Sequence, residues 1–119
     1  MDMLQKIFEL QGRLDAEITE KRNIDKLPTE RIQMNALAII SELSEVLDEV
    51  NFKWWKNPKE VDHDALVEEI VDVMHFLVGM FIYAGADAEE VFRVYMSKHQ
   101  ENVNRQRGLS SKAGYEVGR

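Results

Sequence analysis

Two pairs of carboxylates recur at helical spacing in the middle of the sequence and could hold metal ions. Glu42 and Glu45 form the first pair, and Glu69 and Asp72 form the second, each with its members three residues apart. On an α-helix this spacing places both carboxylates of a pair on one face. Since Mg²⁺ prefers carboxylate oxygens together with water and phosphate, two such pairs that meet across a helix–helix contact could share cations.

The second pair lies in an apolar segment, which favours the metal interpretation. Residues 66–84 are apolar on nearly every side, so we expect the most buried helix of the domain here. Carboxylates in such a place carry a high desolvation cost unless something compensates them. A buried salt bridge is the alternative, but the two acidic segments offer only His75 and Arg31 as basic residues. A basic partner from another helix remains open, as does a solvated acidic stripe.

Three further side chains have two interpretations each. His75 lies on the side of Glu68, away from the second acid pair, which favours a core histidine that donates a hydrogen bond over a metal ligand or base. Trp54 and Trp55 could plug the core from a loop. Three lysines flank them, however, and aromatic rings among lysines are also suited to stacking on a base beside phosphates. We do not expect both tryptophans to have the same role.

The elements that must position these residues are helices. Apolar residues at helical spacing predict four of them, over residues 2–22, 29–50, 62–85 and 88–107. Pro28 and Pro58 fall in polar connections, Gly85 suits a left-handed helix end, and Asp87 with Glu90 resembles a capping box. No segment has a strand pattern, so the predicted fold class is all-α.

Length and composition exclude several classes of protein. With 119 residues the chain fits one domain, and without cysteine it has no disulfide scaffold or cysteine-based site. A net charge of -7 argues against a general nucleic-acid binder. The N-terminal sequence lacks a signal-peptide layout and the apolar run at 70–84 is too short to span a bilayer, so we expect a cytoplasmic protein without membrane partners.

The four acids and several flanking segments resemble a known family. SELSE and EIVD together give E-x-x-E-x23-E-x-x-D, which is similar to the signature of the all-α NTP pyrophosphatases, including MazG proteins and dimeric all-α dUTPases. The stretches LQGRLD, FKWWK, EEIVDVMHFLVG and YMSKHQENVNRQRG resemble segments of the all-α dUTPases. The resemblance covers roughly residues 4–107, with a looser match in the ending GLSSKAGY.

The resemblance implies a metal-dependent hydrolysis. In that family the four acids hold Mg²⁺ ions that grip a nucleoside triphosphate, and a water activated there attacks the α-phosphorus. The products are a nucleoside monophosphate and pyrophosphate. The implied ligands are Glu42, Glu45, Glu69 and Asp72, for two or more Mg²⁺ ions with Mn²⁺ as a substitute, and Glu45 is the implied catalytic base.

The resemblance also implies substrate contacts. The family positions that bind phosphate correspond to Lys98, Asn102 and Arg105, which share one helix face in the basic C-terminal end of the chain. Those associated with the base correspond to Gln11 and Asp15, although many dimeric dUTPases have asparagine in place of Asp15, and Trp54 or Trp55 would supply stacking on the base.

The expected function is a Mg²⁺-dependent nucleoside triphosphate pyrophosphatase that converts dUTP to dUMP. One alternative is a MazG-like house-cleaning enzyme for another or modified nucleotide, and one from another class is a non-enzymatic helical interaction module. A single chain cannot easily cover the third helix, so we expect a four-helix bundle completed by homo-oligomerisation, as a homodimer or homotetramer. Residues 1–107 are expected to form the domain and residues 108–119 a flexible tail.

Overall fold

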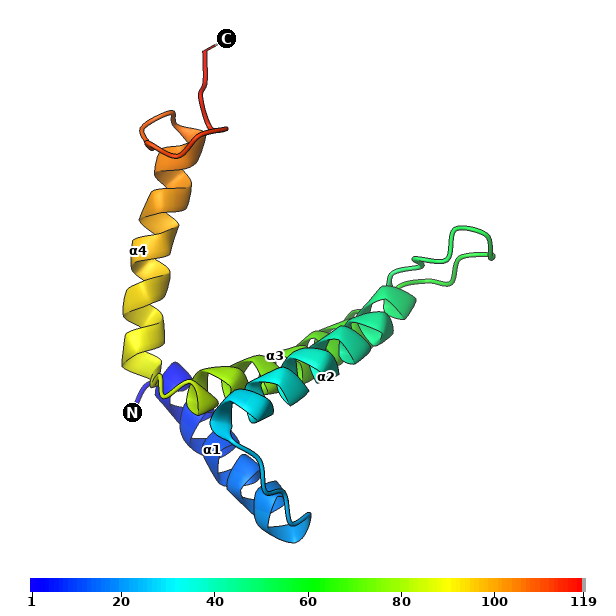
Figure 1. Cartoon of the computed structure of the whole chain (residues 1–119). Coiled ribbons are helices and arrows are strands. Elements are labelled where there is room, and N and C mark those ends of the chain that lie inside the picture. The colour runs from blue at the N-terminus through cyan, green and yellow to red at the C-terminus, as the bar shows by residue number, and fades with distance from the viewer. Residues whose placement is uncertain (119) are drawn as a thin grey trace. The chain divides into compact units, whose positions relative to one another are not determined.

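The structure is a computed structural model that describes residues 1–118. Its elements are four α-helices, and no strand occurs in this range (Figure 1). The helices are α1 (Met3–Lys21), α2 (Pro28–Glu49), α3 (His63–Tyr83) and α4 (Ala88–Gln106). The all-α prediction is confirmed, and each helix begins and ends within two residues of its predicted bounds.

Short polar side chains fix where the helices begin. Asp62 accepts a hydrogen bond from the backbone N–H of Ala65, and Asp87 accepts one from that of Glu90, at 3.2 and 2.9 Å. Each bond satisfies one N–H that the first turn of a helix leaves free. The chain leaves α3 through Gly85, whose φ of 82° lies in the left-handed region that glycine adopts without strain. Asp87 therefore caps α4, but the described residues do not show the second bond of the predicted capping box, from the backbone of Asp87 to the side chain of Glu90.

The chain divides into two compact units, the first comprising Met1–Ala86 and the second beginning at Asp87. The expected single domain over residues 1–107 stays a prediction. In the first unit α2 and α3 run antiparallel and form a helical hairpin (Figure 1). The helix α1 crosses this hairpin near the beginning of α2. Phe8 of α1 stacks on Phe81 of α3 with ring centroids 6.3 Å apart, which joins α1 to the hairpin.

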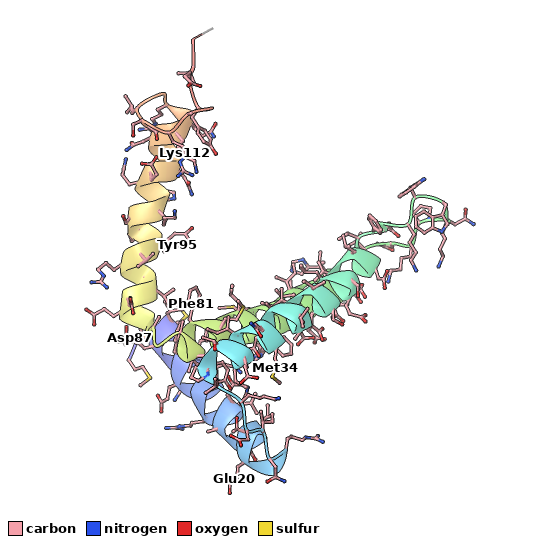
Figure 2. The ribbon with its side chains drawn as sticks, in the orientation of Figure 1. Glu20, Met34, Phe81, Asp87, Tyr95 and Lys112 are labelled. Carbon is pink, nitrogen blue, oxygen red and sulfur yellow. The ribbon has the colours of Figure 1, made fainter. Side chains whose placement is uncertain are left out.

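The hairpin leaves much apolar surface uncovered. Within α3 only Val78 and Gly79 are buried, while five large apolar side chains between residues 67 and 77 are 37–50% exposed. Figure 2 shows side chains along α2 and α3 that point away from both helices. As expected, α3 has more buried and half-buried residues than any other helix in residues 1–118, but α1 and α2 cover only part of its circumference.

The second unit consists of α4 and the segment that follows it. Leu109 donates a backbone hydrogen bond of 2.8 Å to the carbonyl of Asn104, and further contacts join residues 110–117 to the last turns of α4. Through residue 118, no helix is long and apolar enough to cross a membrane.

Candidate functional site

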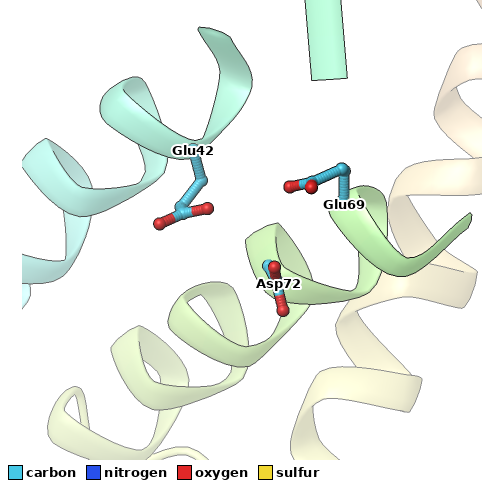
Figure 3. Close-up of side chains that lie close together, drawn as sticks. All are labelled: Glu42, Glu69 and Asp72. Carbon is cyan, nitrogen blue, oxygen red and sulfur yellow. The ribbon is translucent and has the colours of Figure 1, made fainter. Parts of the chain in front are cut away.

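Three carboxylates from two helices meet at one place on the hairpin. Glu42 of α2 and Glu69 and Asp72 of α3 each offer an oxygen, and these oxygens all lie within 4.8 Å of one another (Figure 3). The i, i+3 spacing on α3 brings Glu69 and Asp72 to one face, and the antiparallel packing places Glu42 opposite them. The two predicted acid pairs thus contribute three of their four members to one cluster.

Glu45 lies one turn beyond Glu42 on α2 and is exposed. Its oxygens are outside the group that lies within 4.8 Å, although its charge still acts on Glu69. An exposed carboxylate beside the cluster can accept a proton from a water molecule there. Its roles as metal ligand and catalytic base stay predictions.

The electrostatics of the cluster favour a cation. The pKa of Glu69 is raised by partial desolvation first, and then by the negative charges of Asp72, Glu45 and Glu42. The ion pairs found in residues 1–118 use other acids, namely Glu9, Glu17, Glu49 and Glu101. The salt-bridge alternative is therefore not realised at the cluster. An all-oxygen set of ligands with unneutralised charge fits Mg²⁺ or Mn²⁺ better than a soft metal.

A second polar group lies between α1 and α3. Gln11 is buried, its Nε2 donates to Oδ1 of Asp15 at 2.9 Å, and its Oε1 lies 2.6 Å from Nδ1 of His75. Gln11 and His75 also line a hollow of about 220 Å³ whose other walls are six apolar side chains of α1 and α3. The hydrogen bond expected of His75 is present, but the residue lies at the surface and not in the core.

Asp15 is the member of this group whose carboxylate is poorly compensated for its burial. Desolvation raises its pKa, and the hydrogen bond from Gln11 and the charges of Arg31 and His75 oppose this only in part. Its Oδ2 is buried and has no hydrogen-bond partner among the described residues. A carboxylate held in this way can be kept because it serves a ligand or a neighbouring copy of the chain.

Arg31 was considered in the sequence only as a salt-bridge partner for the acids, and the structure gives it another place. It is buried, donates from Nη1 to Thr19 Oγ1 at 2.7 Å, and stacks over Tyr83 with Cζ 4.6 Å from the ring centroid. It thereby ties α1, α2 and α3 together. It is the only Lys or Arg of α2, and this was the only sequence signal for such a role.

Trp54 and Trp55 lie in the loop between α2 and α3, at the end of the hairpin distant from α1 (Figure 1). They are 79% and 61% exposed and pack edge to face on each other and on Phe52. The single chain therefore does not use them as a core plug. It also does not bring them together with Gln11 and Asp15, the other predicted base-binding residues.

The lysines beside the tryptophans surround a polar hollow. Lys53, Lys56 and Lys59 line it together with Asp48 and other polar residues, and its volume is about 310 Å³. The loop is closed by Asn51, whose side chain exchanges two hydrogen bonds of 2.9 Å with the backbone of Lys59. These two bonds close the loop that carries both the lysines and the exposed aromatic rings.

The predicted phosphate-binding residues Lys98, Asn102 and Arg105 follow one another on α4 in the second unit. Arg105 makes a long contact of 3.5 Å from Nη1 to Oδ1 of Asn102 and a 3.1 Å ion pair from Nε to Glu101. Two of the three predicted residues are therefore in contact, and Glu101 is a neighbour that the sequence patterns did not single out.

Known proteins are similar to this chain over part of its length. A family model described as dUTPase matches residues 3–90, which include α1, α2, α3 and the acidic cluster. The dCTP pyrophosphatases of Enterobacteria phage T4 and Enterobacteria phage LZ5 are each 45% identical over 38 residues, covering 32% of this chain and 22% of the phage protein. A "DNA replication protein" of Enterobacteria phage T4 is 42% identical over 36 residues, which cover 30% of this chain and 9% of that protein. No solved structure matches the chain.

Proposed function

Because this chain belongs to the all-α dUTPase family, we propose that it is a Mg²⁺-dependent nucleoside triphosphate pyrophosphatase with dUTP as substrate. The observation that carries the proposal is the convergence of Glu42, Glu69 and Asp72 within 4.8 Å at the junction of α2 and α3. The products are dUMP and pyrophosphate. The similarity to phage proteins covers less than a quarter of their length, so the activity rests mainly on the family and the cluster.

The cluster would hold the divalent cation through carboxylate oxygens of Glu42, Glu69 and Asp72, with Glu45 completing the set from the next turn of α2. When bound, Mg²⁺ or Mn²⁺ polarises phosphoryl oxygens and increases the acidity of a coordinated water. Glu45 accepts the proton of the attacking water, because it is the exposed carboxylate beside the cluster.

The other predicted residues bind the rest of the substrate. Lys98, Asn102 and Arg105 hold the phosphates of the leaving pyrophosphate through charge-assisted hydrogen bonds. Gln11 and Asp15 contact the base, and Trp54 or Trp55 stacks on it. The two groups stand apart in one chain, and a second copy of the chain can bring them together.

A second substrate, dCTP, is favoured by a specific observation. The phage relatives named dCTP pyrophosphatase share 45% identity with part of this chain. Asp15 stands where many dUTPases have asparagine, and a carboxylate can accept a hydrogen bond from an amino group of cytosine. A MazG-like preference for a modified nucleotide would also retain the same phosphate chemistry.

Self-association as a homodimer or homotetramer is the remaining part of the proposal. Leu37, Ile40 and Leu43 of α2 are 43–68% exposed, and their spacing of three residues places them along one side of that helix. Exposed apolar side chains gathered in this way favour an interface. Sedimentation analysis should give a mass that is an even multiple of 13.9 kDa.

The experiment that tests the function is product analysis with a panel of ribo- and deoxyribonucleoside triphosphates and Mg²⁺. The proposal predicts monophosphate and pyrophosphate, with dUTP the fastest substrate. Faster turnover of dCTP would move the base assignment to the second candidate. No turnover of any triphosphate, combined with a melting temperature that Mg²⁺ leaves unchanged, would favour a non-enzymatic interaction module.

A further inference from the structure

We infer that the segment following α4 positions Arg105 for phosphate binding, through Glu101, Ser110 and Tyr115. The inference rests on the proposed function, which assigns Arg105 to a substrate phosphate. It adds three positioning residues that act through Arg105 and do not themselves touch the substrate.

Glu101 links the segment to the arginine. One oxygen of its carboxylate, Oε1, accepts from Arg105 Nε at 3.1 Å and from Ser110 Oγ at 2.6 Å. The hydrogen bond from Ser110 is the main reason that the pKa of Glu101 is lowered, with Arg105 as a further cause. The carboxylate therefore stays ionised in weakly acidic solution, where it continues to hold the guanidinium.

Tyr115 covers one face of the same guanidinium. The Cζ atom of Arg105 lies 5.3 Å from the centroid of the Tyr115 ring, within the range of a cation–π contact. The Arg105 side chain is only 18% exposed, although it is charged and near the end of a helix. Ion pair and ring together therefore fix the plane of the guanidinium.

The backbone brings these residues to the arginine through a tight turn. Gly108 has a φ of 73°, and a Cβ on it would lie 2.5 Å from Cγ2 of Val117. The chain thus reverses at Gly108 and passes close to its own later residues. A larger residue at this position would push the segment away from α4.

The contacts leave one edge of the guanidinium available. Nε is used by Glu101 and one face by Tyr115. Within residues 1–118, the outer edge with Nη1 and Nη2 makes only the 3.5 Å contact to Asn102. This outer edge is the one that binds two phosphate oxygens in parallel. Because its orientation is set before substrate arrives, less side-chain entropy is lost on binding.

The test compares variants of the full chain that keep or remove the contacts. Tyr115→Leu removes the ring, and Tyr115→Phe keeps it while removing the hydroxyl. Ser110→Ala removes the hydrogen bond to Glu101, and Ser111→Ala is the matched control at an exposed neighbouring serine. We expect Tyr115→Leu and Ser110→Ala to lower kcat/KM about 3- to 10-fold, mainly through KM, with Tyr115→Phe and Ser111→Ala close to wild type.

The same substitutions in an Arg105→Ala background separate positioning from a general structural role. If the residues act through Arg105, the effects of Tyr115→Leu and Ser110→Ala disappear in that background. Three outcomes would overturn the inference. The effects could persist in the Arg105→Ala background, or Tyr115→Leu and Ser110→Ala could leave the kinetics of the wild-type background unchanged. The third is a loss in Tyr115→Phe equal to that in Tyr115→Leu.

A binding measurement distinguishes failure of the inference from failure of the proposed function. Calorimetric titration with inorganic tripolyphosphate and Mg²⁺ requires no turnover. If wild type hydrolyses no nucleotide but binds tripolyphosphate and Tyr115→Leu weakens that binding, the inference stands and the enzymatic proposal fails. Absence of both hydrolysis and tripolyphosphate binding would overturn both.

Discussion

The side-chain oxygen of Gln11 lies 2.6 Å from Nδ1 of His75 and joins α1 to α3. Since Nε2 of Gln11 already donates to Asp15, its Oε1 is the group that faces His75. The ring must then donate from Nδ1, and His75 also lines the hollow between the two helices. The series of hydrogen bonds from Asp15 through Gln11 to His75 thus fixes which polar groups face that hollow.

Gln11→Met removes both hydrogen bonds while nearly keeping side-chain volume. It leaves the partly buried carboxylate of Asp15 without its donor and the Nδ1 of His75 without its acceptor. We expect the free energy of unfolding to fall by about 2–4 kcal/mol, measured by urea denaturation. Gln33→Met, at an exposed position of α2, is the control, and equal losses in the two variants would contradict the account.

Asp15→Asn tests the raised pKa of the buried carboxyl. Because the folded-state pKa lies above the ordinary value of 3.8, the stability that Asp15 contributes is full below that pH. It is lost as the pH rises through the folded-state pKa. Asp15→Asn should therefore gain stability relative to wild type between acidic and neutral pH. Asp25→Asn, in the connection between α1 and α2, serves as the control. A gain in stability of Asp15→Asn that is confined to acidic pH would contradict the raised pKa of Asp15.

Gly79→Ala and Gly12→Ala form a matched pair of helical glycines. A Cβ on Gly79 would lie 2.5 Å from Nδ2 of Asn35 and 3.1 Å from Oδ2 of Asp15, whereas one on Gly12 would meet only Ile82, at 4.0 Å. We expect Gly79→Ala to destabilise by about 1–3 kcal/mol. Gly12→Ala should stabilise by up to about 1 kcal/mol through helix propensity. Thermal unfolding of both variants measures the difference, and similar melting temperatures would contradict the packing described for Gly79.

Glu69→Gln tests whether the acidic cluster holds a divalent cation. Removing one charge relieves repulsion from Asp72, Glu45 and Glu42, so the metal-free variant should melt no lower than wild type. Mg²⁺ should raise the melting temperature of wild type in a concentration-dependent way, and this rise should be largely lost in Glu69→Gln. Glu68→Gln, one residue away on an exposed position of α3, should retain the rise. A rise of equal size in Glu69→Gln would place the cation elsewhere.

The sequence predicted the helices and the pairing of Glu69 with Asp72 because both depend on local spacing. The side chain of Asp87 marks the start of α4, and the i, i+3 interval of Glu69 and Asp72 places them together on α3 whatever surrounds the helix. The contact between Gln11 and His75 depends instead on how α1 crosses α3. The spacing of apolar residues contains no information on that crossing.

What covers the rest of α3 could not be predicted for a related physical reason. An apolar surface such as that of Val71 and Met74 shows that something should cover it, but does not say whether the cover is the same chain. Arg31 was missed as a structural residue because its partners, Thr19 and Tyr83, lie on two other helices.

Release of pyrophosphate from dUTP in the presence of Mg²⁺, by wild type beside Glu45→Gln and Glu68→Gln, tests the central claim most directly. The account predicts turnover by wild type and by Glu68→Gln, and a loss of about 10²- to 10⁴-fold in Glu45→Gln. Turnover by Glu45→Gln at the wild-type rate would contradict the role of Glu45 as base. No Mg²⁺-dependent release of pyrophosphate from dUTP, dCTP or any other triphosphate by wild type would contradict the enzymatic function itself.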